Sequence, residues 1–188
     1  DIHGISNDDV VDAPDAKQAL KLFFEFIQGS DLVAHNAMFD LGFVIKESQL
    51  HHIKLPKLDV FDSLKFARSI YAKSEERPEN FKLPTLAHYI DFTYNSHRAL
   101  DDSLATLFFW NHCVQKHGEN KIKKSTEKSQ IFSTHKVKEY QIQNHSKYQL
   151  LGEIIETQDK AIIIYNGGSK KGQERPIKPI ALIPLPNQ

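Results

Sequence analysis

The sequence predicts an α/β fold followed by a small strand-containing unit, and three observations lead to this prediction. Short apolar runs alternate with segments of helical periodicity up to about residue 117, as strands and helices do in an α/β domain. The segment 118–146 is then rich in lysine, serine and threonine, and 147–188 contains one helical segment and two apolar runs. We therefore divide the chain into a main domain (1–117), a polar linker (118–146) and a small α+β appendage (147–188).

The elements expected in the main domain follow from local signals. Pro14 and Gly29 bound the first helix, because proline favours helix starts and glycine helix ends. Its apolar stripe consists of Leu20, Phe23, Phe24 and Ile27. Next come a buried strand at 31–35, a helix at 38–50, a strand at 58–61 with a helix after it, a short helix at 83–90, and a long helix that ends at Gly118. In the appendage we expect a helix at 147–158 and a hairpin of 160–165 with 175–185 around a turn at 166–173.

Composition narrows the class of protein. The formal net charge is zero, so no global field attracts a polyanion, although a local patch or bound metal ions could. Cys113 is the only cysteine, which excludes an internal disulfide and fits the reducing cytoplasm. No apolar run approaches the roughly 20 residues of a membrane-spanning helix, so we expect no membrane partner and a cytoplasmic protein. The opening residues lack an initiator methionine, and we expect a piece of a longer chain.

Two carboxylates stand out. Asp102 shares a helical face with small or apolar residues: Ala99, Ala105, Thr106, Phe109 and Cys113. A carboxylate on such a face needs a cation, a metal or strong donors, although an aspartate at a helix start also suits the helix dipole. Asp40 follows a strand, where α/β folds bind ligands, and the same dipole explanation applies to it. His97, in the loop before the long helix, is either a general base or an exposed loop histidine. We interpret Asp62 as an N-cap.

These residues lie in motifs that resemble a known family. "HNAMFD" at 35–40 and "HRALDD" at 97–102 resemble the second and third motifs of DEDDh 3′–5′ exonucleases, especially those like the proofreading epsilon subunit of bacterial DNA polymerase III. "IHGIS", "DSLKFAR" and "LPTLAHYI" occur in that family's order. The resemblance covers about residues 2–115. It implies a ribonuclease H-like fold and a metal-dependent exonuclease acting at DNA 3′ ends, with a DNA polymerase as a potential partner.

The resemblance also implies roles for particular residues. Asp40 and Asp102 would be metal ligands and His97 the general base, with His35, Asn36 and Phe39 supporting the site or the substrate strand. Two divalent ions, Mg²⁺ or Mn²⁺, would stabilise the attacking and leaving oxygens of phosphodiester cleavage, and such hard ions prefer carboxylates.

The family's first motif, an Asp-x-Glu pair on the first strand, does not occur before Asp40. Asp8, Asp9 and Asp12 lie in a turn-rich region, and we do not take them as replacements. We therefore expect a truncated domain that is inactive and poorly stable as it stands. We also expect an open sheet edge and an exposed stripe on the first helix.

Other features and functions stay open. Lys121, Lys123 and Lys124 could contact phosphates without reading sequence, or belong to a solvated tether. The tail resembles the opening strands of a WYL-type module, in which Arg175 would bind nucleic acid or a ligand; an ordinary hairpin is the alternative. An RNA-trimming exonuclease of the same superfamily, and a non-catalytic adaptor that binds a polymerase or nucleic acid, are the alternative functions. The sequence does not predict the oligomeric state.

Overall fold

The α/β class is confirmed by the computed structural model, which describes residues 4–93, 95, 97–135, 146–166 and 171–179. Most helices and strands lie where the sequence predicts them. In chain order the elements are η1 (Asp8–Val10), α1 (Ala16–Phe26), β1 (Leu32–Ala34), α2 (Met38–Leu50), β2 (Asp59–Asp62), α3 (Ser63–Tyr71), α4 (Leu83–Tyr89), α5 (Ala99–Lys116), α6 (Glu119–Ser129), β3 (Gln130–Ser133), α7 (Ser146–Thr157), β4 (Ala161–Ile164) and β5 (Glu174–Ile177).

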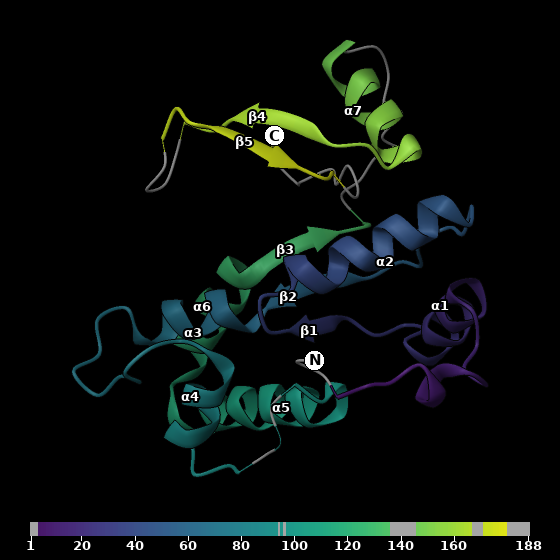
Figure 1. Cartoon of the computed structure of the whole chain (residues 1–188). Helices are drawn as coiled ribbons and strands as arrows, with labels where there is room; N and C mark the ends of the chain where they lie inside the picture. Colours follow the sequence, from purple (N-terminus) through teal and green to yellow (C-terminus); the bar gives the residue numbers. More distant parts are fainter. Residues whose placement is uncertain (1–3, 94, 96, 136–145, 167–170, 180–188) are drawn as a thin grey trace.

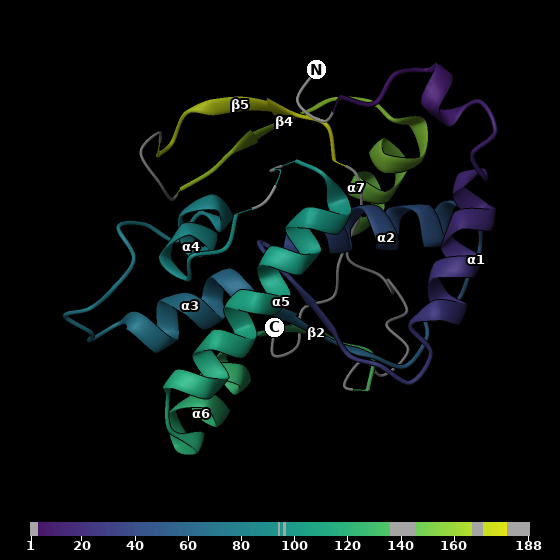
Figure 2. The same ribbon diagram turned by 90° about the horizontal axis from the view of Figure 1, so that it is seen from below.

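A mixed sheet in the order β1–β2–β3 forms the centre of the main domain (Figure 1). β1 and β2 are parallel, with Ala34 opposite Asp62, so both strands end at the same edge. β3 runs antiparallel to β2. α5 runs along the β1 side of the sheet in both views (Figures 1 and 2). Among the described residues no strand pairs with the outer edge of β1.

The first hydrophobic core lies between α1, α2 and the sheet. Its buried members are Ile27, Ala37, Leu41, Ile45, Leu58, Val60, Ile131 and Phe132. Phe23 and Phe24 pack against this core, and Leu20 is only 8% exposed. The expectation that the α1 stripe would be left exposed is therefore wrong, because α2 and the sheet already cover it.

A second core joins α3, α4 and α5. The Phe66 and Trp110 rings stack with centroids 3.8 Å apart, and Tyr71 and Phe109 are fully buried beside them. Cys113 is also buried, and desolvation raises the pKa of its thiol to about 11. The thiol therefore stays protonated at neutral pH and acts as a small apolar packing group.

The prediction of a polar linker at 118–146 is wrong for residues 119–133, which form α6 and β3. α6 packs against α3 through small side chains: Ser125 and Ser129 are buried, and the Ser125 hydroxyl donates to the Ser69 hydroxyl over 3.0 Å. β3 then places Ile131 and Phe132 in the first core. Residues 136–145 of the expected linker lie outside the described residues.

The appendage contains the expected helix and hairpin. β4 and β5 pair antiparallel, with Ala161 opposite Ile177, and α7 precedes them. In Figure 1 this unit lies on the β3 side of the sheet, away from α5. Residues 167–170 of the predicted turn and 180–185 of the second run lie outside the described residues. No helix in the described part of the chain is both long and apolar enough to cross a membrane.

The burial of Phe132 generates a test of whether β3 belongs to the core. Phe132 is 2% exposed, whereas Phe26 on α1 is 88% exposed. We expect Phe132→Ala to lower the free energy of unfolding by about 3–5 kcal/mol, and Phe26→Ala to change it by less than about 0.5 kcal/mol. Urea denaturation followed by circular dichroism measures both. Equal midpoints for the two variants would mean that β3 is not part of the core.

Candidate active site

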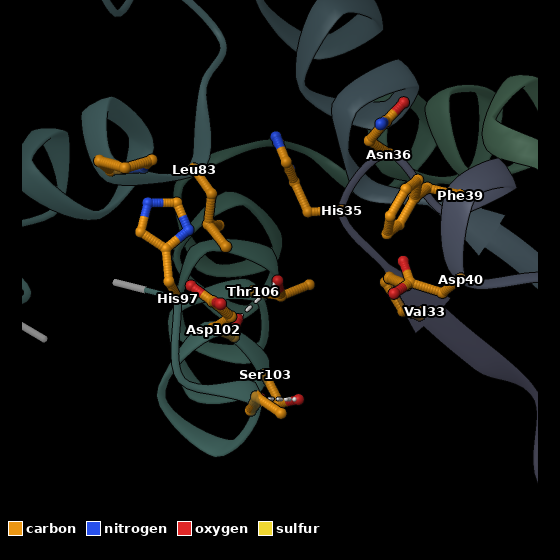
Figure 3. Close-up of a pocket in the computed structure, with 13 residues that line it drawn as sticks. Val33, His35, Asn36, Phe39, Asp40, Leu83, His97, Asp102, Ser103 and Thr106 are labelled. Atoms are coloured by element: carbon orange, nitrogen blue, oxygen red, sulfur yellow. Dashed lines mark hydrogen bonds between the residues drawn. The ribbon is translucent and has the colours of Figure 1, made fainter. Parts of the chain in front are cut away.

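A pocket of about 630 Å³ opens between the β1–α2 junction and the start of α5 (Figure 3). Parallel pairing of β1 and β2 places the junction at the carboxyl edge of the sheet, and α5 closes the pocket from the β1 side. The lining residues are Val33, Ala34, His35, Asn36, Phe39, Asp40, Leu83, Pro84, His97, Ala99, Asp102, Ser103 and Thr106.

Six of the predicted site residues share this pocket: His35, Asn36, Phe39, Asp40, His97 and Asp102. Asp40 and Asp102 come from the first turns of α2 and α5 and lie on facing walls, with His97 beside Asp102 (Figure 3). The other four do not line the pocket. Lys121, Lys123 and Lys124 are exposed on α6, and Arg175 lies on β5 with its guanidinium 5.9 Å from the centre of the Tyr165 ring. Their nucleic-acid contacts stay predictions.

The Asp40 carboxyl sits in an unfavourable electrostatic environment. Partial desolvation raises its pKa above the ordinary value, and the negative charges of Asp102 and Asp62 raise it further. The side chain nevertheless keeps access to the open pocket. A bound cation would offset the cost of ionising the Asp40 carboxyl in this environment.

Asp102 lies near the N-terminal end of the apolar face of α5 that the sequence predicted. Ala105, Thr106, Phe109 and Cys113 on that face are all buried. The Thr106 hydroxyl donates to the Asp102 backbone carbonyl oxygen over 2.9 Å. This bond does not involve the Asp102 carboxylate, whose position follows from the helix. Asp102 also lies in the first turn of α5, so the helix dipole stabilises its charge.

Two residues of the pocket have left-handed backbones. Asn36 has φ 59° and His97 has φ 68°. Asparagine and histidine occur in this region more often than most other non-glycine residues, but any residue with a Cβ atom pays a free-energy cost there. His97 is exposed directly before the N-cap residue Arg98, so the left-handed turn presents its imidazole at the mouth of the pocket.

His35 is held at the back of the junction. Its Nδ1 lies 2.9 Å from the Ser63 hydroxyl. Desolvation lowers the pKa of His35 and outweighs the opposing effect of the Asp62 charge. A neutral imidazole is therefore favoured near pH 7, and its Nδ1 atom shares a hydrogen bond with the Ser63 hydroxyl.

Phe39 offers an apolar surface beside Asp40. It is 64% exposed, and its ring meets that of Phe43 edge-to-face with centroids 5.2 Å apart. Exposed aromatic rings of this kind are suited to stacking with unpaired bases.

Leu83 and Ser103 line the pocket but were not predicted as site residues from the sequence. Ser103 could have been found, because Ala99, Asp102, Ser103 and Thr106 follow the i, i+3, i+4, i+7 spacing of one helical face. Leu83 comes from α4, and no spacing in the sequence relates it to α5.

The residues present fit a single hard cation. Mg²⁺ commonly binds proteins through one or two carboxylates and completes its shell with water and substrate phosphates, a role that Asp40 and Asp102 could fill. The described residues contain no group of three or more histidine, cysteine, aspartate or glutamate side chains that could hold a metal ion. A second ion would therefore need ligands from outside this set.

Comparison with known proteins finds a family model and several similar proteins. The family model described as "Exonuclease" matches residues 1–108. A DNA polymerase III PolC-type protein of Caldanaerobacter subterraneus is 32% identical over 135 residues, which cover 71% of this chain and 9% of that protein. The PolC-type protein of Bacillus subtilis is 34% identical over 110 residues, or 57% of this chain and 7% of that protein. The DNA polymerase III subunit epsilon of Buchnera aphidicola is 38% identical over 74 residues, or 37% of this chain and 32% of that protein. The chain thus spans only a small part of these relatives.

The raised pKa of Asp40 predicts a pH-dependent stability. A carboxyl with a raised folded-state pKa adds stability below its unfolded pKa, and that stability is lost as the pH rises through the folded pKa. Asp40→Asn should therefore raise the melting temperature at pH 7 in the presence of a chelator, and the gain should shrink as the pH approaches 4. Asp101→Asn is the control, since Asp101 is in the first turn of α5 but outside the pocket. An Asp40→Asn gain that does not depend on pH would contradict this account.

Proposed function

The chain belongs to the exonuclease family, whose domains have the ribonuclease H-like fold, and from this membership we propose that it is a metal-dependent 3′–5′ exonuclease domain acting on DNA. The observation that supports the proposal most strongly is the convergence of Asp40, Asp102 and His97 on one pocket, together with exposed Phe39. The family generally uses divalent metal ions, and the two carboxylates suit such an ion.

Each side chain has a chemical task in this proposal. Asp40 and Asp102 would hold a divalent ion, which when bound supplies charge stabilisation for the phosphate and an acidified water. The His97 imidazole would accept the proton of the water whose oxygen attacks the terminal phosphodiester phosphorus. The bond from phosphorus to the 3′ oxygen of the preceding nucleotide then breaks, that oxygen takes up a proton from solvent water, and a nucleoside 5′-monophosphate is released. Phe39 would stack on the terminal base and favour an unpaired 3′ end.

The relatives suggest the setting. Their names describe DNA polymerase III proteins, so we propose that the substrate is a frayed DNA 3′ end and that a DNA polymerase is a partner. The similarity covers 9% of the PolC-type protein and 32% of the epsilon subunit.

Metal binding can be tested separately from turnover. We expect Mn²⁺ to stabilise the 188-residue chain, by about 2.7 kcal/mol when its concentration is 100-fold above the dissociation constant. Asp102→Asn should abolish most of this stabilisation, whereas Asp101→Asn, one residue away and outside the pocket, should retain it. Thermal melts with and without Mn²⁺ make the comparison. Equal Mn²⁺ effects in the two variants would argue against a metal site at Asp102.

Hydrolysis is tested with 5′-labelled single-stranded DNA and a matched RNA. No Asp-x-Glu pair precedes Asp40 in the sequence, so we expect the 188 residues alone to bind DNA without appreciable turnover. Joined to a strand that supplies such a pair, they should shorten DNA from the 3′ end with Mg²⁺ or Mn²⁺. In this active form His97→Ala should lower the rate by about 10²–10⁴-fold.

His52→Ala is the matched control, because His52 is also an exposed histidine with a left-handed backbone (φ 52°) but lies outside the pocket. Preferred cleavage of RNA would favour the RNA-trimming alternative. Binding without cleavage in the joined form would favour the adaptor. Turnover by the 188 residues alone would mean that other carboxylates complete the site.

A further inference from the structure

The turn that leads into α2 is tied to the start of α3 through one carboxylate oxygen. The Oδ1 atom of Asp62 accepts the backbone N–H of Asn36 over 3.1 Å and that of Leu64 over 2.8 Å. The bond to Leu64 caps α3, which confirms the N-cap predicted from the sequence. The bond to Asn36 spans 26 positions of the chain and links two segments that meet only because β1 pairs with β2.

The bond to Asn36 falls at a backbone position that needs support. Asn36 adopts φ 59°, and left-handed residues persist when the surrounding structure holds them in place. The carbonyl oxygen of Asn36 accepts the N–H of Phe39 over 3.0 Å. The backbone orientation at Asn36 therefore helps to set the orientation of the first turn of α2. Phe39 and Asp40, which line the pocket, belong to that turn.

A second contact reinforces the first. Ser63, next to Asp62 and fully buried, lies within hydrogen-bonding distance of His35, next to Asn36. Asp62 is itself only 3% exposed and does not line the pocket. Its Oδ1 atom already accepts two backbone N–H groups, so we do not count Asp62 among the candidate metal ligands.

We propose that Asp62 is a positioning residue, which fixes the left-handed turn at Asn36 and thereby sets the place of Asp40 in the pocket. The inference rests on the proposed function for the meaning of that placement. Residues that orient metal ligands through a hydrogen-bonded neighbour typically change metal affinity by about 10–100-fold when they are altered.

Two substitutions separate capping from positioning. Serine is as good an N-cap as aspartate, but its hydroxyl is one bond closer to the backbone, so Asp62→Ser should keep the bond to Leu64 and lose the bond to Asn36. Asp62→Asn keeps an acceptor oxygen at the same reach and should retain both bonds. Comparing the two therefore distinguishes the tie to Asn36 from the helix cap.

Three measurements on the 188-residue chain test the proposal: urea denaturation, hydrogen exchange of the Asn36 amide by NMR, and Mn²⁺ affinity by calorimetry. Asp62→Ser should keep a cooperative unfolding transition, accelerate Asn36 exchange at least about 10-fold, a factor that corresponds to about 1.4 kcal/mol, and weaken Mn²⁺ binding about 10–100-fold. Asp62→Asn should restore slow exchange and most of the affinity. Unchanged exchange and affinity in Asp62→Ser would overturn the proposal.

The readouts also distinguish this inference from the proposed function. If the wild-type chain binds no Mn²⁺ yet Asp62→Ser accelerates Asn36 exchange, the exonuclease proposal fails and the structural tie is supported. If Asp62→Ser does not fold, the wild-type amide decides, because exchange of Asn36 at the rate of an unprotected amide would overturn the tie.

Discussion

The parallel pairing of β1 with β2 is the constraint on which the candidate site depends. Because Ala34 lies opposite Asp62, the two chain segments that leave these strands emerge side by side. One of them turns into α2 with Asp40 in its first turn, and the other caps α3 with Asp62. Each strand is short, so a shift of one residue would exchange the faces of its side chains. The apolar contacts of Val60 in the first core oppose such a shift and so protect the geometry of the pocket.

Most of the elements could be predicted from the sequence because their signals are local. Apolar periodicity identified α1, α2 and α5, and Gly29 and Gly118 marked the ends of α1 and α5. α6 was missed because it packs through serines rather than through an apolar stripe, and buried Ser125 and Ser129 look like solvated residues in the sequence. β3 was missed with it, since a four-residue strand after a polar helix has no independent signal. The coverage of the α1 stripe was misjudged because it depends on tertiary contacts with α2 and the sheet.

The candidate site was predictable in part. The helical face around Asp102 indicated a carboxylate set against packed residues, and the motifs at 35–40 and 97–102 indicated that Asp40 and His97 belong with it. Their convergence on one pocket needed the fold, because the two segments approach only after α5 returns along β1. The spacing of residues in the sequence likewise could not show that Leu83 lines the pocket, or that Asp62 accepts hydrogen bonds from both Asn36 and Leu64. Both features depend on segments that are brought together by tertiary structure.

The left-handed backbone at His97 sets the stability of the fold against the catalytic role proposed for this residue. A non-glycine residue held in this region costs on the order of 1–3 kcal/mol, a sizeable part of the roughly 5–15 kcal/mol that stabilises a typical domain. Glycine at position 97 would relieve that cost, so selection for stability alone would be expected to remove the imidazole. If the proposed hydrolysis were no longer selected, position 97 would therefore be expected to change before the buried face of α5.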